Sequence, residues 1–334
     1  MPSPPSPART VRRRALLAAA LPAAALPFAA RPARAADGFP SRPISIVVPF
    51  APGGGTDVLA RLLAKHMGET WNQPVVVDNR AGAAGRLGVE LVQRAAPDGH
   101  TLVMASTGAL MATAGTTRPF AVREVLAPVT LAAAPAYLVV ASPALGVTDL
   151  RGLLDAAKRN PGTIGFGSSG AGSASHLVGE LFCSTAGVEM LHVPYRGTGQ
   201  ALNDLLAGRI GVMFAPPPTV AGAVADGSLH VLGLTSETRS PLFPGVPTVA
   251  EGGLPGYSAV GWFGLLAPRG TPAPVVEAIQ AVAARGLQSP ETRERLASLG
   301  AVPEPLSPTA FADYIDADVG KWQRLIRDRG ITME

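Results

Sequence analysis

A glycine-rich loop between an expected strand and an expected helix is the first feature of this sequence that could do chemistry. Residues 47–57 read VVPFAPGGGTD, so an apolar stretch runs into three glycines and then into an amphipathic segment. Glycine lets the backbone approach a ligand closely, and N–H groups at a helix start carry partial positive charge. The loop therefore predicts an anion site, with a tight turn that holds no ligand as the alternative. Thr56 is the expected N-cap, and Asp57 is expected to pair with Arg61 one turn later.

Four further loops of small residues also follow expected strands. They are DNRAGAAGRLG (78–88), Ser106-Thr107-Gly108, GFGSSGAGSASH (165–176) and VPYRGTG (193–199). Ligands of open parallel sheets lie at the carboxyl ends of the strands, so these loops are expected to meet at one site. Arg196 could clamp a carboxylate with two hydrogen bonds, or it could pair with Asp204 on the surface. His176 is expected to be a structural hydrogen-bonding residue rather than a catalyst.

Motifs of common enzyme classes are missing from these loops. The glycine loop lacks the Gly-Lys-Ser/Thr ending of a phosphate-binding loop and the G-x-G-x-x-G spacing, and GFGSSGAG does not contain G-x-S-x-G. The five histidines are scattered without metal-ligand spacing, so we expect neither a metal site nor a cofactor. The single cysteine, Cys183, lies in an apolar run and is expected in the core.

The N-terminus has the pattern of a secretory signal. A basic start, an apolar middle and the sequence Ala33-Arg34-Ala35 predict cleavage after Ala35 by either the general or the twin-arginine route. A transmembrane anchor is the alternative, but the apolar stretch is short and contains Pro22 and Pro27. Removing the six arginines of residues 1–35 from the 28 basic residues leaves 22 against 24 acidic ones, a net charge of about −2. A nucleic-acid partner is therefore not expected.

The rest of the chain alternates between expected strands and helices. Continuous apolar strands favour a parallel sheet covered on both faces. Two long extended runs, 127–142 and 257–268, predict crossovers between two α/β lobes, and helices are expected at about 274–287, 290–299 and 308–329. The predicted fold is a hinged clamshell of two doubly wound lobes. Lobe 1 is expected to contain residues 36–137 and 260–334, and lobe 2 residues 138–259.

Several segments resemble the tripartite tricarboxylate transporter substrate-binding proteins, also called Bug-type receptors. The resemblance is carried by FPSRPISIVVPFAPGGGTDVLARLLAKHM, QPVVVDNRAGAAGRLG, APDGHTLVMAS, GSSGAGSASHLVGELF, HVPYRGTGQALNDLLAGRIGVMF and GWFGLLAPRGTP. It implies a type II periplasmic binding fold that takes a small carboxylate and passes it to the membrane components of a transporter. The matching ligand loops are Phe50 to Asp57, Ala81 to Gly85, Ser168 to His176 and Tyr195 to Gly197. One departure is Ala215-Pro216-Pro217-Pro218, where family members often carry an acidic or amide residue.

These observations together predict a periplasmic, monomeric receptor for a small organic carboxylate. A sensing receptor with a signalling partner is an alternative, and a hydrolase with His176 near Ser173 is a further one. The expected ligand-binding residues are Phe50, Ala51, Gly54, Gly55, Thr56, Asp57, Gly82, Ala83, Ala84, Gly85, Ser106, Thr107, Ser168, Ser169, Gly170, Ser173, His176, Tyr195, Arg196 and Gly197.

Overall fold

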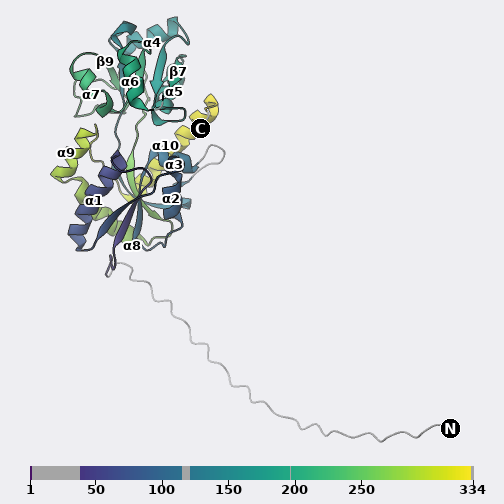
Figure 1. Ribbon diagram of the computed structural model, residues 1–334, viewed down its shortest axis with the longest axis vertical. Helices are drawn as coiled ribbons and strands as arrows, with labels where there is room; N and C mark the ends of the chain where they lie inside the picture. Colours follow the sequence, from purple (N-terminus) through teal and green to yellow (C-terminus); the bar gives the residue numbers. More distant parts are fainter. Residues whose placement is uncertain (2–37, 115–120, 196, 332–334) are drawn as a thin grey trace. The chain divides into compact units, whose positions relative to one another are not determined.

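The computed structural model describes Met1 and residues 38–114, 121–195 and 197–331 (Figure 1). The predicted signal sequence therefore lies outside the described residues, apart from Met1. The helices and strands of the described chain are, in order, β1 (Ile44–Val48), α1 (Gly55–Trp71), β2 (Val75–Asn79), η1 (Ala83–Gly85), α2 (Arg86–Gln93), β3 (Thr101–Ser106), α3 (Thr107–Ala114), η2 (Val122–Glu124), β4 (Leu126–Ala133), β5 (Leu138–Ala141), η3 (Pro143–Leu145), α4 (Leu150–Arg159), β6 (Gly165–Ser168), α5 (Ala174–Ala186), β7 (Leu191–Pro194), α6 (Thr198–Leu206), β8 (Val212–Ala215), α7 (Pro217–Ala225), β9 (His230–Leu234), β10 (Phe263–Pro268), α8 (Ala273–Leu287), α9 (Pro290–Ser298) and α10 (Pro308–Arg329).

The strands form two sheets, which confirms the prediction of two α/β lobes. Lobe 1 is named here for the sheet β2-β1-β3-β10-β4 with its helices, and lobe 2 for the sheet β7-β6-β8-β5-β9 with its helices. The chain passes from lobe 1 to lobe 2 between β4 and β5, and it returns between β9 and β10. These two passages are the predicted crossovers. The residue bounds given above for the lobes stay a prediction.

The expectation of parallel strands is correct for part of each sheet and wrong for β5 and β10. Strand β1 pairs in parallel with β2 and β3, but β10 is antiparallel to both β3 and β4. In lobe 2, β6 pairs in parallel with β7 and β8, whereas β5 is antiparallel to β8 and β9. Both antiparallel strands directly follow a crossover. The chain therefore enters each sheet from the opposite end, and both sheets are mixed.

Both faces of the lobe 1 sheet are buried. Along β1, Ile44, Ile46 and Val48 pack with α1 and α8, whereas Val47 packs on the other face with α2, α3 and α10. Alternate strand residues point to opposite faces, so a strand that is apolar at nearly every position needs a helix layer on each side. This arrangement fixes the strand ends, and with them the loops that follow.

Lobe 2 is built in the same way around β5. Leu138 and Val140 face one layer, which contains α6 and α7, and Val139 and Ala141 face the layer that contains α5. Cys183 of α5 is 1% exposed, as expected for a core residue. Burial raises the pKa of its thiol to about 12, so the sulfur is protonated at neutral pH and is not a nucleophile.

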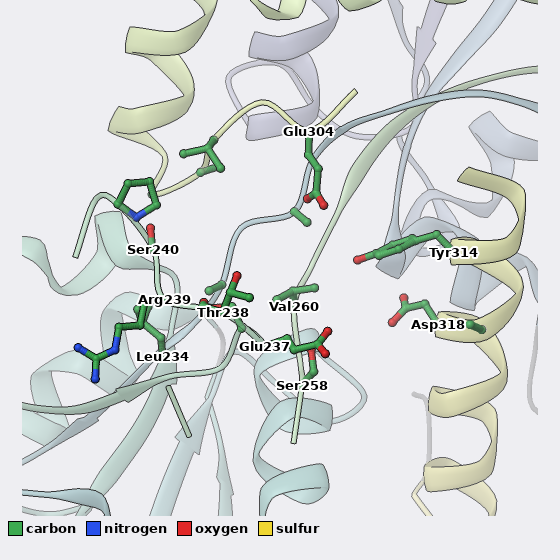
Figure 2. Close-up of a pocket in the computed structure, with 18 of the residues that line it drawn as sticks. Leu234, Glu237, Thr238, Arg239, Ser240, Ser258, Val260, Glu304, Tyr314 and Asp318 are labelled. Carbon is green, nitrogen blue, oxygen red and sulfur yellow. The ribbon is translucent and has the colours of Figure 1, made fainter. Parts of the chain in front are cut away.

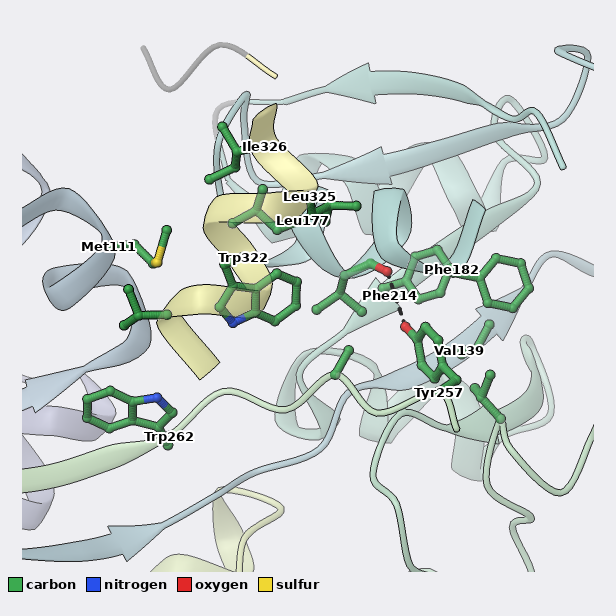
Figure 3. Packing of buried hydrophobic residues seen from close by; sticks show 14 of the residues in the cluster. Met111, Val139, Leu177, Phe182, Phe214, Tyr257, Trp262, Trp322, Leu325 and Ile326 are labelled. Carbon is green, nitrogen blue, oxygen red and sulfur yellow. Dashed lines mark hydrogen bonds between the residues drawn. The ribbon is translucent and has the colours of Figure 1, made fainter. Parts of the chain in front are cut away.

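Helix α10 contacts both lobes. Its start is defined by the Ser307 side chain, which accepts a hydrogen bond from the Ala310 N–H, and its end by Gly330 in the left-handed conformation. Figure 3 shows Trp322, Leu325 and Ile326 of this helix beside Leu177 of α5. Near the end of the helix, Arg329 donates a hydrogen bond of 2.9 Å to Glu180 of α5.

Candidate functional site

Two neighbouring cavities lie where several helices begin. They have volumes of about 220 and 320 Å³ and share five lining residues, Thr107, Gly108, Tyr137, Ala174 and Gly261. The larger one is lined by Gly55 at the start of α1, Thr107 and Gly108 of α3, Ala174 of α5, and the prolines that begin α7. No described residue that lines either cavity is charged. Helix N-termini around an uncharged space favour a negatively charged group.

The glycine loop before α1 is held in place by the Asp57 carboxylate. Asp57 is 3% exposed and accepts hydrogen bonds from the Gly53 N–H at 3.0 Å and from the Asn79 amide at 2.9 Å. It also forms the expected ion pair with Arg61, with a distance of 2.9 Å. The Asp57 side chain therefore supports the loop from behind and lines neither cavity.

The predicted N-cap of α1 is wrong. The helix begins at Gly55 with Gly54 as its N-cap, and no side chain caps it, so Thr56 lies inside the first turn and is buried. The reason is that Asp57 takes over the anchoring of the loop. In the described chain, the N–H groups of Gly54 and Gly55 have no hydrogen-bond partner. Phe50 and Gly55 line the cavities, whereas Ala51, Gly54 and Thr56 do not.

Asp57 should make the stability of the protein depend on pH in the acidic range. The hydrogen bond from Arg61 lowers its pKa from 3.8 to about 2, with further help from Gly53 and Asn79 against the opposing effect of burial. A carboxylate with a lower pKa in the folded than in the unfolded state stabilises the fold at pH values above its unfolded-state pKa. This stabilisation is lost as the pH falls from about 4 through about 2. We expect Asp57→Asn to lose about 1 to 2 kcal/mol near neutral pH, after discounting for the solvent-exposed Arg61.

Urea unfolding of both proteins near pH 7 and near pH 3 measures this effect. The difference between wild type and Asp57→Asn should shrink at the lower pH, because the wild-type carboxylate becomes partly protonated there. Arg61→Lys is the matched control, since it keeps the charge but loses the two-pronged contact. An equal difference at both pH values would show that the ionised carboxylate is not responsible.

The end of β3 leads directly into α3, and this junction lines both cavities. The Ser106 hydroxyl accepts a hydrogen bond from the Ala109 N–H at 3.4 Å, and the Thr107 hydroxyl accepts one from the Trp262 N–H at 3.1 Å. The N–H of Gly108 has no partner within the described residues. Both predicted hydroxyl residues line a cavity, but the free main-chain donor is the adjacent glycine.

The second glycine loop, before α2, supports this wall and lines neither cavity. A Cβ atom on Gly85 would lie 2.8 Å from Ala109 of α3 and 3.1 Å from the ring of Phe50. Gly85 has φ 97° and Ala83 has φ 48°, both in the left-handed region. Gly82 lies in the same loop as Ala83 and Gly85, while the side chain of Ala84 lies outside the described atoms. A direct contact between ligand and residues 82–85 therefore stays a prediction.

Serines in the lobe 2 loop bind mainly to their own loop. The Ser168 hydroxyl bonds the Gly170 N–H at 3.1 Å and His192 Nε2 at 2.6 Å, and Ser168 itself is fully buried. The Ser175 hydroxyl accepts from the Ser169 N–H at 3.1 Å. Of the predicted residues here, Ser173 lines a cavity, and Ser168, Ser169 and Gly170 shape the loop behind it.

His176 is a structural residue in this arrangement. Its Nδ1 accepts a hydrogen bond from the Gly172 N–H at 3.0 Å, and its ring stacks on His192 with centroids 3.6 Å apart. The Ser173 hydroxyl accepts from the main-chain N–H of His176 and does not bond the imidazole. Burial and the neighbouring His176 lower the pKa of His192 to about 4, so this ring is neutral at neutral pH. The Ser173–His176 pair that a hydrolase would need is not formed.

The loop after β7 contributes nothing to the two cavities among its described residues. Tyr195 donates a hydrogen bond of 2.8 Å to Asp204, and Asp204 also binds Arg209 at 2.7 Å. Gly197, with φ 123°, precedes α6. Arg196 lies outside the described residues, so its predicted role as a carboxylate clamp stays a prediction.

Sequence reasoning missed residues that distant segments bring to the site. Tyr137 and Gly261 come from the two crossovers, Trp262 precedes β10, and Trp322 comes from α10. Pro216 and Pro218 line the larger cavity, so the proline-rich departure from the family pattern forms an apolar wall there. The sequence signal that could have identified Tyr137 and Trp262 was the presence of aromatic residues in the two extended runs, because the crossovers of a two-lobed protein pass beside its cleft.

A third cavity, larger than these two, lies elsewhere in the described chain. It has a volume of about 560 Å³ and lies between the loop around Arg239 and helix α10 (Figure 2). Figure 2 shows the carboxylates of Glu237, Glu304 and Asp318 around it. Asp318 is engaged already, since it accepts from the indole of Trp262 at 2.9 Å and pairs with Lys321 at 3.0 Å. Arg239 and Lys321 also line the cavity, so the three carboxylates leave a net negative charge, which disfavours an anion here.

Two other kinds of feature, a metal site and a membrane span, are absent from the described residues. No group of three or more His, Cys, Asp or Glu side chains there could hold a metal ion. None of the described helices combines the length and the apolar character needed to span a bilayer.

The two sheets, the two crossovers and the cavities at the helix N-termini define a two-lobed solute-binding protein. The chain belongs to the tripartite tricarboxylate transporter receptor family, because the family model TctC, "Tripartite tricarboxylate transporter family receptor", matches residues 59–331. This confirms the resemblance found in the sequence. A protein in the tcbD-tcbE intergenic region of Pseudomonas sp. strain P51 is 41% identical over 88% of both chains. BugT of Bordetella pertussis is 36% identical, over 90% of this chain and 93% of its own.

Solved structures of similar proteins agree in fold. R. palustris Rpa4515 with adipate is 32% identical, with a TM-score of 0.69 over 88% of this chain and 99% of that one. MatC from Rhodopseudomonas palustris with bound malate is 33% identical, with a TM-score of 0.68 over 86% and 100%. The periplasmic binding protein BugD is 32% identical, with a TM-score of 0.67 over 88% and 99%. Of these three neighbours, BugD is described as a periplasmic binding protein, and the other two structures contain a small carboxylate.

Proposed function

We propose that this chain is an exported receptor that captures a small organic carboxylate and presents it to the membrane components of a tripartite tricarboxylate-type transporter. Residues 1–35 would direct export. The adipate and malate found with two similar proteins support a carboxylate ligand. The family description supports a transporter as the partner.

The observation that carries the proposal is the convergence of helix N-termini on the two cavities. The first residues of α1, α3 and α5 line them, and the main-chain N–H groups of Gly55, Gly108 and Ala174 have no partner within the described chain. Each N–H can donate to a carboxylate oxygen, and each helix adds partial positive charge. Because no described lining residue is charged, these donors are the main source of attraction for an anion.

Closure of the lobes around the ligand would remove water from these donors. Hydrogen bonds to a charged group contribute about 1.5 to 3 kcal/mol each when they replace water. Micromolar affinity corresponds to about −8 kcal/mol, so a few such bonds with apolar contacts are sufficient after the costs of association.

A thermal-shift screen of the chain without residues 1–35 tests the proposal. The panel contains hexanoate, benzoate, adipate, malate and citrate, with glucose and divalent metal ions as controls. We expect at least one carboxylate to raise the melting temperature in a concentration-dependent way, because a ligand that binds only the folded state stabilises it. Stabilisation by the sugar or the metal ions alone would contradict the proposed function.

A further inference from the structure

Three side chains connect helix α10 to the loop that precedes α5. The Nε and Nη2 atoms of Arg329 each lie 2.9 Å from Glu180 Oε2. The other oxygen of this carboxylate, Glu180 Oε1, lies 3.7 Å from His176 Nε2. On the far side of the imidazole ring, His176 Nδ1 accepts a hydrogen bond of 3.0 Å from the Gly172 N–H. The series of contacts therefore runs from α10 through α5 to Gly172.

This series ends at the wall of the smaller cavity. Gly172, Ser173 and Ala174 all line that cavity. The N–H of Gly172 is engaged by His176, whereas the N–H of Ala174 has no partner within the described chain. Because only one residue separates Gly172 from Ala174, a displacement of Gly172 would also change the direction of the free N–H.

The bond from Gly172 determines which nitrogen of His176 carries the hydrogen. A neutral imidazole has one N–H donor and one acceptor nitrogen. Since Nδ1 accepts from Gly172, the hydrogen is on Nε2, and it faces the carboxylate of Glu180. The opposite tautomer would place the N–H of Nδ1 against the N–H of Gly172, and the bond that holds the loop would be lost.

Glu180 favours the tautomer that the loop requires. Glu180 is 8% exposed and His176 is 7% exposed, so little water competes with their contact. Burial alone would raise the pKa of Glu180, but the interactions with His176 and Arg329 outweigh it and lower this pKa below its ordinary value. The carboxylate is therefore ionised near neutral pH. It accepts hydrogen bonds and cannot donate them, so it stabilises the form with hydrogen on Nε2.

We propose that His176, Glu180 and Arg329 are positioning residues for ligand binding, which hold the loop before α5 so that the Ala174 N–H points at the carboxylate of the ligand. This inference rests on the proposed function and deepens it. None of the three side chains lines either cavity, so they act on the ligand only through the loop.

Two substitutions of His176 separate this role from a general loss of packing. The amide oxygen of asparagine lies close to the place of Nδ1, so His176→Asn keeps an acceptor for the Gly172 N–H. The amide of glutamine reaches the place of Nε2 instead, so His176→Gln removes that acceptor.

Calorimetric titration near neutral pH compares these variants with the wild type. Hexanoate, benzoate, adipate, malate and citrate are titrated, and the carboxylate that binds the wild type most tightly is used for the comparison. We expect its affinity to fall about tenfold in His176→Gln and no more than about threefold in His176→Asn, because one hydrogen bond holds the loop.

The pair of variants contains its own control for packing. Both substitutions remove the imidazole ring and its stacking on His192, so a purely structural role of the ring would lower the affinity equally in both. Melting temperatures without ligand show whether each variant is folded. Equal losses of affinity in the two variants, or a wild-type affinity in His176→Gln, would overturn the proposal.

NMR of the wild-type protein with nitrogen-15 in its histidines reads the tautomer without any substitution in the tested chain. The signals of His176 are identified by their absence in His176→Asn. We expect the hydrogen on Nε2, and a hydrogen on Nδ1 would overturn the proposal.

Glu180→Gln tests the second residue of the series. The glutamine amide can donate to Nε2 as well as accept from it, so the tautomer with hydrogen on Nδ1 should appear in the NMR spectrum. Affinity for the same carboxylate should fall about threefold or more as the bond to Gly172 is lost. An unchanged tautomer together with an unchanged affinity would contradict the role of Glu180.

The proposed function and this inference fail in different ways. If none of the five carboxylates binds the wild type, the proposed function is wrong. If one of them binds the wild type, His176→Asn and His176→Gln equally well, the carboxylate receptor stands and the positioning role is wrong.

Discussion

Replacing Gly108 by aspartate should abolish carboxylate binding and leave the fold intact. A Cβ atom at Gly108 has no neighbour within 4 Å, and the residue lines both cavities. The new carboxylate would therefore stand in the space meant for the ligand. Two like charges about 4 Å apart repel each other by about 4 kcal/mol at an effective dielectric constant of about 20. We expect affinity for any carboxylate that binds the wild type to fall at least about a hundredfold.

Gly108→Asn separates charge from volume in this experiment. Asparagine has nearly the same shape but no charge, so we expect a loss of no more than about tenfold. Aspartate is favourable in the first turn of a helix and has a higher helix propensity than glycine, so the melting temperature of Gly108→Asp without ligand should not fall. Calorimetry of both variants with the same ligand gives the comparison. Equal losses would mean that the site is blocked by size, and that the ligand is not held as an anion.

Phe311→Ala should cause the largest loss of stability among simple truncations near the site. Phe311 of α10 is fully buried, and its ring lies edge-on to Trp262 with centroids 5.5 Å apart. It also fills the space above Gly264 of β10, where a Cβ atom would lie 2.1 Å from its ring. Removing the ring leaves a cavity between α10 and the sheet. We expect a loss of about 3 to 5 kcal/mol in the free energy of unfolding.

Urea unfolding followed by circular dichroism measures this loss, with Phe311→Leu as the matched control. Leucine refills part of the space and should cost clearly less than alanine. Gly264→Ala together with Phe311→Leu should be more stable than the sum of the single effects predicts, because the smaller side chain leaves room for the new methyl group. A loss below about 1 kcal/mol for Phe311→Ala would show that α10 does not depend on this contact.

The regular elements could be predicted well where the sequence marks their ends. Helices α8, α9 and α10 were expected at 274–287, 290–299 and 308–329, and they lie at Ala273–Leu287, Pro290–Ser298 and Pro308–Arg329. A proline at the start of each, after a serine cap in α9 and α10, gives a clear local signal.

Two helices were missed for different reasons. Helix α3 follows β3 without a connecting loop, and its sequence TGALMATA has no polar face, so no amphipathic period marks it. Helix α4 does carry the signals, since Asp149 caps it and Leu150, Leu153 and Leu154 form a buried stripe. The orientation of β5 and β10 could not be predicted, because local patterns contain no information on the end from which a strand enters a sheet.

Some residues that line the cavities can be predicted from local sequence patterns, and others cannot. Gly55, Thr107 and Ser173 lie where a strand ends and a helix begins, which the sequence shows directly. Tyr137, Trp262 and Trp322 reach the cavities through crossovers and a C-terminal helix, and such long-range contacts leave no short motif. Asp57 was expected to bind the ligand, but its burial and its bond to Gly53 give it a supporting position behind the glycine loop.

A comparison of an acid with its uncharged amide tests the central claim most directly. Hexanoate and hexanamide, or benzoate and benzamide, have nearly the same size and differ in charge. Calorimetric titration of the wild-type chain near neutral pH should show binding of the acid and an affinity for the amide at least about a hundredfold weaker, because unpaired N–H donors and helix N-termini act on the negative charge. Equal binding of acid and amide would contradict the claim that this cleft holds its ligand as an anion.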